Sequence, residues 1–151
     1  MLSRHPDHSD RQRWMGVLAR ASSEELEALW QTHGVGTELA AIRPAETGLV
    51  MVRGRAGGTG RRFNLGEMTV TRCAVAGADG IVGHAYVKGR DKRHAELAAA
   101  FDALLQEERR RPALLAAVVA PLAEAQAARS TATAARAATT RVDFFTLVRG
   151  G

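Results

Sequence analysis

The chain has 151 residues, of which 46% are hydrophobic, so it is long enough for one domain to bury a core without disulfides or structural metal. Lys and Arg outnumber Asp and Glu by 21 to 16, and the resulting net charge of +5 favours phosphate-bearing ligands or acidic protein surfaces. Cys73 is the only cysteine, which excludes an internal disulfide and a site built from several thiolates, and makes a reducing compartment the natural expectation.

The N-terminal segment, residues 1–10, is polar and lacks the apolar core of a signal peptide. We interpret it as an extension of a single domain that spans residues 1–151. The most apolar run, residues 113–123, includes Pro121 and is far shorter than the ~20 residues that cross a bilayer. We therefore expect a cytoplasmic protein without a membrane segment.

Two helices are predicted first. Trp14, Val17 and Leu18 recur at helical spacing behind the polar start. Ser22 and Glu25 then have the spacing of a capping box that opens a second helix. Gly34 is a residue type that commonly ends a helix.

The next segment changes to short β-branched runs separated by glycines. These runs predict four antiparallel strands, around residues 39–42, 49–52, 68–75 and 81–87. Alternation around Thr71 and Cys73 indicates that one sheet face packs on helices. With a further strand expected at the C-terminus, the predicted class is α+β, with an antiparallel sheet of about four to five strands packed against helices.

A glycine- and arginine-rich segment, residues 53–62, permits two interpretations. Glycines let backbone amides approach a phosphate, which would make this a phosphate-binding loop. However, the segment lacks the Gly-Lys-Ser or Gly-Lys-Thr signature, and strand-like residues follow it where a nucleotide-binding loop would open a helix. A hairpin loop is therefore the favoured interpretation.

The transition from the last of these strands to a helix, within residues 83–96, is the most informative part of the chain. The pattern predicts a helix from Asp91 to about Arg111, with Asp91 accepting a hydrogen bond from its first turn. A helix N-terminus favours negative charge, so cations around it can bind a phosphate or the carboxylate of a partner. The candidate anion- or partner-binding residues here are Lys88, Arg90, Asp91, Lys92 and His94.

Catalytic candidates are few. Glu46 precedes a turn-like Thr-Gly pair and could serve as a general base or only fix that turn. His94 could act as a base, alone or with His84, but a histidine on an apolar helix face is more often a hydrogen-bonded packing residue. No metal-ligating pattern is present, so no metal site is predicted.

The C-terminal part begins with Pro112, which can open another helix, and Pro121, which should bend or break it. Residues 125–140 are rich in Ala, Thr and Arg and read as a docked helix or a tether. Residues 141–150 have the composition of a strand that either closes this sheet or adds to a partner. Arg141 is a candidate contact, and Phe144 and Phe145 are candidate apolar anchors.

Several blocks together resemble the PhnG family, the small subunit of the bacterial carbon-phosphorus lyase core complex. The blocks, which cover most of the chain in the family's order, are residues 13–15, 42–50, 57–60, 63–67, 89–96 and 141–150. In the fifth block, Arg93 interrupts a Gly-Arg-Asp-Lys-His-Ala-Glu type motif.

The resemblance implies a subunit that acts with PhnH, PhnI and PhnL in transferring the ribose triphosphate of ATP to an alkylphosphonate such as methylphosphonate, with adenine released. It implies PhnJ, a radical iron-sulfur protein, as a further partner that cleaves the carbon-phosphorus bond. A chain with one cysteine cannot hold that cluster, so no cofactor is expected on this chain alone.

Three functions remain open on the sequence. The first, which we favour, is an assembly subunit that holds catalytic partners, because no convincing nucleophile or metal cluster is present. The second is an autonomous enzyme acting on a phosphate ligand, with Glu46 or His94 as base and Arg90 with Lys92 holding a triphosphate. The third is a basic nucleic-acid-binding module, but the few aromatic residues are not interleaved with basic ones, so we expect no nucleic acid among the partners.

Overall fold

The computed structural model describes residues 7–55 and 60–149, and the side chains of Asn64 and of residues 138–149 fall outside that description. Two N-terminal helices, α1 (His8–Arg20) and α2 (Ser23–His33), precede the strands β1 (Ala40–Arg55) and β2 (Arg62–Ala76). A short 3-10 turn, η1 (Ala78–Gly80), leads to β3 (Val82–Lys88) and α3 (Lys92–Leu105). The chain ends with α4 (Arg111–Leu114), the π-helical turn η2 (Leu115–Val119) and the long helix α5 (Ala120–Arg149). The predicted α+β class is confirmed.

The first two helices lie where the local sequence patterns predicted them. Ser22 and Glu25 make a reciprocal capping box, in which each side chain bonds the other residue's backbone N–H at 3.1 Å. Gly34 caps the C-terminus of α2, and its N–H donates to the Trp30 carbonyl. Helix α1 begins at His8, so the end of the predicted polar extension is helical, while residues 1–6 lie outside the described part.

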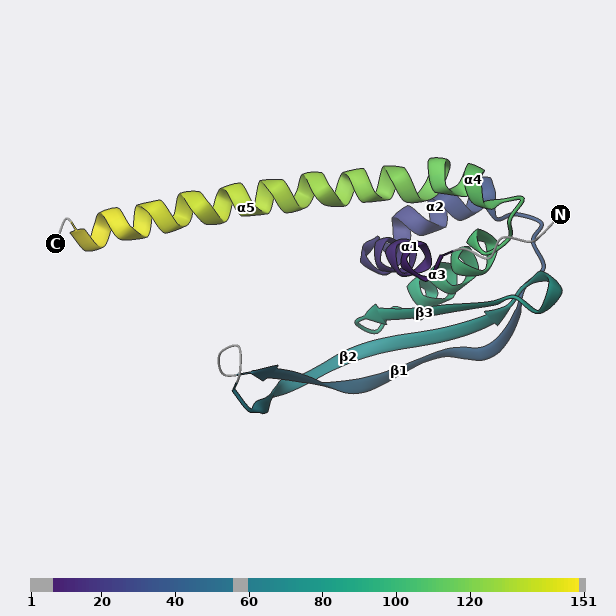
Figure 1. Cartoon of the computed structure of the whole chain (residues 1–151), viewed down its shortest axis with the longest axis horizontal. Coiled ribbons are helices and arrows are strands. Elements are labelled where there is room, and N and C mark those ends of the chain that lie inside the picture. Colours follow the sequence, from purple (N-terminus) through teal and green to yellow (C-terminus); the bar gives the residue numbers. More distant parts are fainter. Residues whose placement is uncertain (1–6, 56–59, 150–151) are drawn as a thin grey trace.

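Within the described residues the sheet has three strands in the order β1-β2-β3, all antiparallel, where the sequence predicted about four to five. The first two predicted strands are one, because β1 continues through Gly48 and absorbs Pro44 in an irregularity between Arg43 and Glu46. Pairing of β2 with β3 stops at Val70 and Lys88, whereas β1 and β2 stay paired to Arg55 and Arg62. Residues 49–55 and 62–69 therefore form a two-stranded projection, here called the hairpin arm, that runs beyond β3 and beyond helices α1, α2 and α3 (Figure 1).

Helices cover one face of the sheet, with α3 nearest to it (Figure 1). On β2 the buried side chains Thr71, Cys73 and Val75 face the helices, and Arg72 on the other face is exposed, whereas Val70 and Ala74 on that other face are buried, so the predicted alternation is only partial. The core surrounds α3, between the sheet and the other helices, and in it the rings of Trp30 and Phe101 meet edge to face at 5.2 Å. The largest fully buried apolar side chains are Trp14, Phe101, Leu18, Leu26, Leu97, Leu104, Leu105, Val87 and Val118.

Helix α3 is shorter than predicted, ending at Leu105 where we expected about Arg111. Arg111 explains the early end, because its guanidinium donates to the carbonyls of Leu105 at 2.8 Å and Gln106 at 3.0 Å. A basic side chain thus satisfies carbonyls that a continued helix would have used. Pro112 then lies in the first turn of α4, as predicted.

The C-terminal region departs most from the prediction. Pro121 does not break the helix, because the π turn η2 just before it accommodates the missing N–H donor. Residues 125–140 are helical within α5, and the expected terminal strand at 141–150 is wrong, since α5 continues to Arg149. An alanine-rich helix that is already nucleated extends at little cost, and here this outweighs the β-propensity of the terminal residues.

Helix α5 contacts the other helices through residues of its first ten. Gln126 donates to the Val17 carbonyl at 2.8 Å, and Arg129 lies 3.7 Å from the Glu25 carboxylate. Residues 130–137 are exposed, and the helix extends away from the body in the same general direction as the hairpin arm (Figure 1). No helix among the described residues has the length and hydropathy to cross a membrane.

Candidate functional site

The turn between β3 and α3 is fixed to the sheet by backbone geometry and one threonine. Gly89 has a φ of +92°, which favours glycine, and it turns the chain from strand to helix. Its N–H donates to the Thr69 carbonyl at 2.9 Å, and its own carbonyl accepts the Thr71 hydroxyl at 2.7 Å. Because Thr71 is fully buried, the turn is held at a defined place beside the base of the hairpin arm.

Asp91 caps α3, as the sequence predicted: its carboxylate accepts the His94 backbone N–H at 3.0 Å. This contact occupies one carboxylate oxygen and places negative charge at the positive end of the helix dipole. The role that the geometry gives to Asp91 is therefore to fix the helix start.

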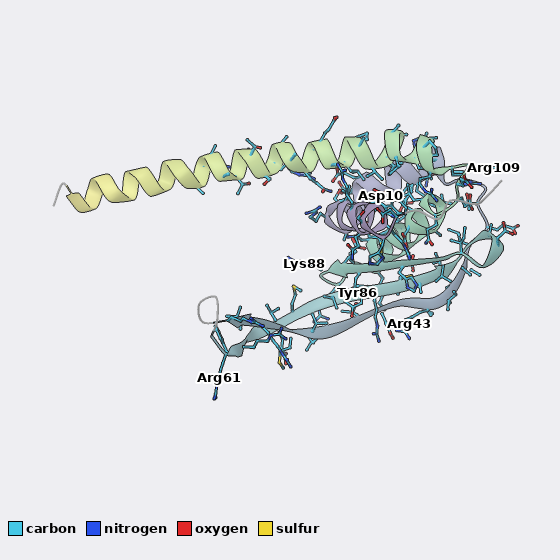
Figure 2. All side chains as sticks on the ribbon, in the orientation of Figure 1. Asp10, Arg43, Arg61, Tyr86, Lys88 and Arg109 are labelled. Carbon is cyan, nitrogen blue, oxygen red and sulfur yellow. The ribbon has the colours of Figure 1, made fainter. Side chains whose placement is uncertain are left out.

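Three cations surround this helix start. Lys88, Arg90 and Lys92 are all exposed, and none of them forms an ion pair within the described residues (Figure 2 labels Lys88). By contrast, Arg93 binds Glu27 at 2.7 Å, and this bond raises the pKa of Arg93 and lowers that of Glu27. The arrangement can attract an anion or an acidic protein surface.

His94 faces the interior. Only 8% of it is exposed, and its Nε2 lies 3.0 Å from the Leu18 carbonyl oxygen. A carbonyl only accepts, so Nε2 carries the proton and the ring links α3 to α1. This placement gives His94 a structural contact and keeps its ring away from solvent.

Glu46 lies on β1, exposed, and is engaged by Arg72 of β2 at 2.8 Å. The bond to Glu46 is the main cause that raises the pKa of Arg72. Because Glu46 and Arg72 are cross-strand partners in register, the pair is a surface ion pair of the sheet.

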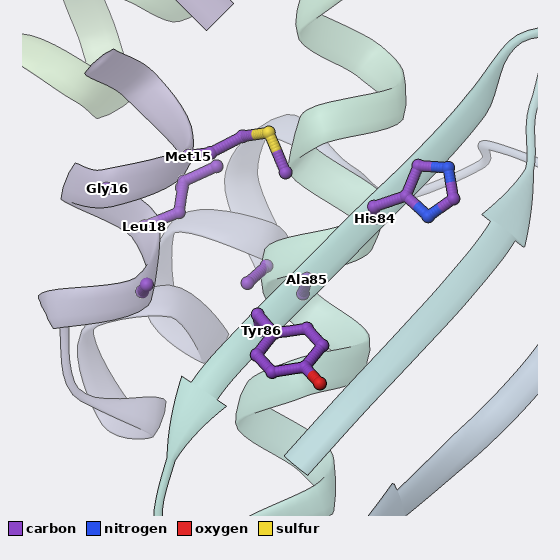
Figure 3. A pocket seen from close by; sticks show the side chains of 8 residues that line it. Met15, Gly16, Leu18, His84, Ala85 and Tyr86 are labelled. Carbon is purple, nitrogen blue, oxygen red and sulfur yellow. The ribbon is translucent and has the colours of Figure 1, made fainter. Parts of the chain in front are cut away.

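Two hollows border β3. One, of about 200 Å³, lies between α1 and β3, with Met15 and Leu18 on one side and His84 and Tyr86 on the strand (Figure 3). A second, of about 530 Å³, shares His84 and Tyr86 and adds Arg43 and Arg72. Among the described residues, no Asp or Glu lines either hollow. The described residues also contain no group of three or more side chains that could hold a metal ion.

Sequence reasoning missed the most connected polar residue of the structure, Asp102. It is fully buried on α3 and accepts the Arg11 guanidinium at 2.8 Å and the Trp14 indole N–H at 2.8 Å. It also accepts the His84 backbone N–H at 2.9 Å. The available signal was a carboxylate between Phe101 and Ala103, on a stretch of helix that is otherwise apolar.

Three candidates lie near the C-terminus. Arg141, Phe144 and Phe145 belong to α5 by their backbone, and their side chains are outside the described residues. Their proposed roles as contact and anchors stay predictions.

Comparison with known proteins decides the family. The sequence profile of the family described as phosphonate metabolism protein PhnG matches residues 9–150. The chain belongs to the PhnG family. A curated PhnG relative from Rhizobium meliloti (strain 1021) is 48% identical over 146 residues, covering 94% of this chain and 90% of the relative. That relative is named alpha-D-ribose 1-methylphosphonate 5-triphosphate synthase subunit PhnG.

Proposed function

We propose that this chain is a subunit of alpha-D-ribose 1-methylphosphonate 5-triphosphate synthase and that it acts by binding partner subunits. The observation that carries the proposal is the 48% identity, over nearly the full length of both chains, to a relative named as that subunit. The reaction of the complex would use ATP and an alkylphosphonate such as methylphosphonate and release adenine. The partners we propose are PhnH, PhnI, PhnJ and PhnL.

The placement of the catalytic candidates supports an assembly role over an autonomous enzyme. Glu46 is bound to Arg72, and His94 is bound to the Leu18 carbonyl in the interior. Each of the two candidates is thus engaged by a neighbouring group of the fold, which supports a structural role for both. Conversely, the hairpin arm and α5 extend from the body and offer surface to other proteins (Figure 1).

The exposed cations Lys88, Arg90 and Lys92 form a second part of the proposed contact surface, where α3 begins. The helix dipole and the three charges act together, so an acidic surface or a substrate phosphate would be bound there. The double variant Arg90→Glu with Lys92→Glu reverses the charge at the helix start and should weaken assembly. The matched control is Arg13→Glu with Arg109→Glu, which reverses two exposed charges elsewhere and should leave assembly unchanged.

The test is co-expression with PhnH, PhnI and PhnJ, followed by size-exclusion chromatography with light scattering. Each pool is assayed, after addition of PhnL, for adenine release from ATP and methylphosphonate. We expect stable co-elution and adenine release only by the assembled pool. Adenine release by the lone chain would contradict an assembly role and return catalysis to this chain, and failure to co-elute would contradict the subunit role.

A further inference from the structure

The two edges of the sheet differ in how their backbone groups are satisfied. On the β3 edge, the His84 N–H donates to Asp102 at 2.9 Å. The Val82 carbonyl on the same edge accepts the Gln106 side chain at 2.8 Å and Arg11 at 3.3 Å. Side chains of Arg11, Asp102 and Gln106 therefore occupy the first part of this edge, at Val82 and His84.

The β1 edge has no comparable cover. Within the described residues, no side chain and no loop backbone bonds to the backbone of residues 46–52. Pairing of this stretch with β2 is regular from Glu46, opposite Arg72, to Val52, opposite Gly66. A regular edge of this length is a template for another strand. The neighbouring register shifts of β1 lie on either side of it, between Arg43 and Glu46 and between Val52 and Arg53.

The register shows which backbone groups face outward. Gly89 donates to the Thr69 carbonyl, so the backbone groups of Thr69 are directed toward the β3 side. Leu49 is the direct partner of Thr69, and in an antiparallel pair its own N–H and C=O must then face away from β2. By the same alternation Thr47 and Met51 also face outward, whereas Gly48 and Val50 bond to β2.

The side chains along this edge define the chemistry of a partner. Leu49 and Met51 are 62% and 51% exposed, and Arg53 and Arg55 follow on the same face. Arg61 and Arg62 add charge at the tip, and none of these four arginines forms an ion pair within the described residues. Glu67 is the one carboxylate on the arm, so the arm is strongly cationic.

A second copy of this chain fits that edge poorly. Pairing β1 with itself would bring together strands that each carry Arg43, Arg53 and Arg55, while their one carboxylate, Glu46, is already bound to Arg72. Like charges opposite one another destabilise a sheet. Charge complementarity therefore favours a different protein with acidic residues.

We propose that an extended segment of a partner subunit adds to β1 as a fourth strand, along residues 47–55. Its apolar side chains face Leu49 and Met51, and its carboxylates face Arg53 and Arg55. The inference rests on the proposed function, because the partner is another subunit of the same complex. Beyond that function, the inference specifies which sheet edge binds the partner, which residues of β1 pair with it and which side chains the partner segment carries.

Hydrogen exchange on the assembled complex and on the free chain tests the proposal directly. Thr47, Leu49 and Met51 should exchange at least about tenfold more slowly in the complex, because their outward amides gain acceptors. Val50, already bonded to β2, should change less. A complex in which the three outward amides exchange as fast as in the free chain overturns the strand addition and leaves the subunit role intact, whereas failure to form any complex overturns both.

Two variants separate the backbone and charge contributions. Leu49→Pro removes an outward N–H without removing a bond to β2, and Leu49→Ala is its matched control with the N–H kept. We expect Leu49→Pro to bind the partner subunits at least about tenfold more weakly than Leu49→Ala. Far-ultraviolet circular dichroism and the exchange rate of Val50 report whether the hairpin has folded.

The double variant Arg53→Glu with Arg55→Glu tests the contribution of the positive charge on the arm. This test remains valid even if the proline variant does not fold. The double variant should weaken assembly by about tenfold or more, while Arg13→Glu with Arg109→Glu should not. Wild-type affinity in both the proline and the charge variants would overturn the proposal. So would a homodimer of the lone chain with protected amides at Thr47, Leu49 and Met51.

Discussion

Trp14 on α1 donates its indole N–H to the buried carboxylate of Asp102 on α3 at 2.8 Å, although 88 residues separate them in the chain. Arg11 binds the same carboxylate, and the His84 amide of β3 is its third donor. One side chain therefore joins α1, α3 and the sheet. Removing it leaves several buried donors unpaired.

Asp102→Ala should lower the free energy of unfolding by about 3 to 5 kcal/mol, the usual cost of breaking a buried charge pair. Asp102→Asn keeps the shape and should cost less. Urea unfolding followed by tryptophan fluorescence measures both, with Asp10→Asn on the exposed start of α1 as control. If Asp102→Ala lowers the free energy of unfolding no more than the control does, the hydrogen bonds of Asp102 do not stabilise the packing of α1.

Gly83→Ala should also destabilise the fold, because α3 lies directly on the β3 backbone. A Cβ at Gly83 would overlap the Ala99 carbonyl and lie 2.7 Å from the Ala103 nitrogen. Overpacking of this kind costs about 1 to 3 kcal/mol. Gly48→Ala, on β1 with no atom within 4 Å of the added Cβ, is the matched control. Equal thermal midpoints for the two variants would contradict the close packing.

The capping box makes part of the stability depend on pH. The Ser22 backbone N–H bonds the Glu25 carboxylate and is the main cause that lowers the pKa of Glu25 below its ordinary 4.5. A lowered folded-state pKa contributes stability that is present above about pH 4.5 and lost as the pH falls through the folded-state pKa.

Glu25→Gln removes that titration, so its unfolding free energy should fall less steeply between about pH 5 and about pH 2 than that of the parent. Urea midpoints across this range measure the difference. Ser22→Ala should cost about 0.5 to 2 kcal/mol at neutral pH through loss of the cap. Parallel pH profiles for the parent and Glu25→Gln would rule out the proposed contribution of Glu25.

Cys73 should react slowly with thiol reagents. Its side chain is buried on β2 against the helices, and burial raises the pKa of its thiol. Modification by an aromatic disulfide reagent near neutral pH should be at least about a hundredfold slower in the native chain than in urea. Ser130→Cys, on the exposed part of α5, provides a fast-reacting reference in the same fold. Similar native rates at both positions would contradict the burial of Cys73.

Neighbouring residues were enough to predict several features correctly. The capping box of Ser22 and Glu25, the cap at Asp91 and the turn at Gly34 depend on contacts within a few residues, so their spacing reveals them. The motif blocks likewise predicted the PhnG family that the comparison confirmed.

Features that depend on distant contacts were not predictable in this way. The merging of two predicted strands into β1 depends on its pairing with β2, and the burial of Asp102 depends on Arg11 and Trp14 of α1. The candidate site was predicted only in part: the cations around α3 were identified, while the open edge of β1 was not, because an edge exists only once strand order is known.

The sequence by itself determined the α+β class, the helix starts, the basic character and the family, since composition, periodicity and local capping act within one stretch of chain. Only the tertiary structure decided that Asp102 is a buried link, that α5 stays helical to Arg149 and that β1 is the uncovered edge. The physical reason is that burial, strand order and the satisfaction of backbone groups depend on segments that meet only in the folded chain.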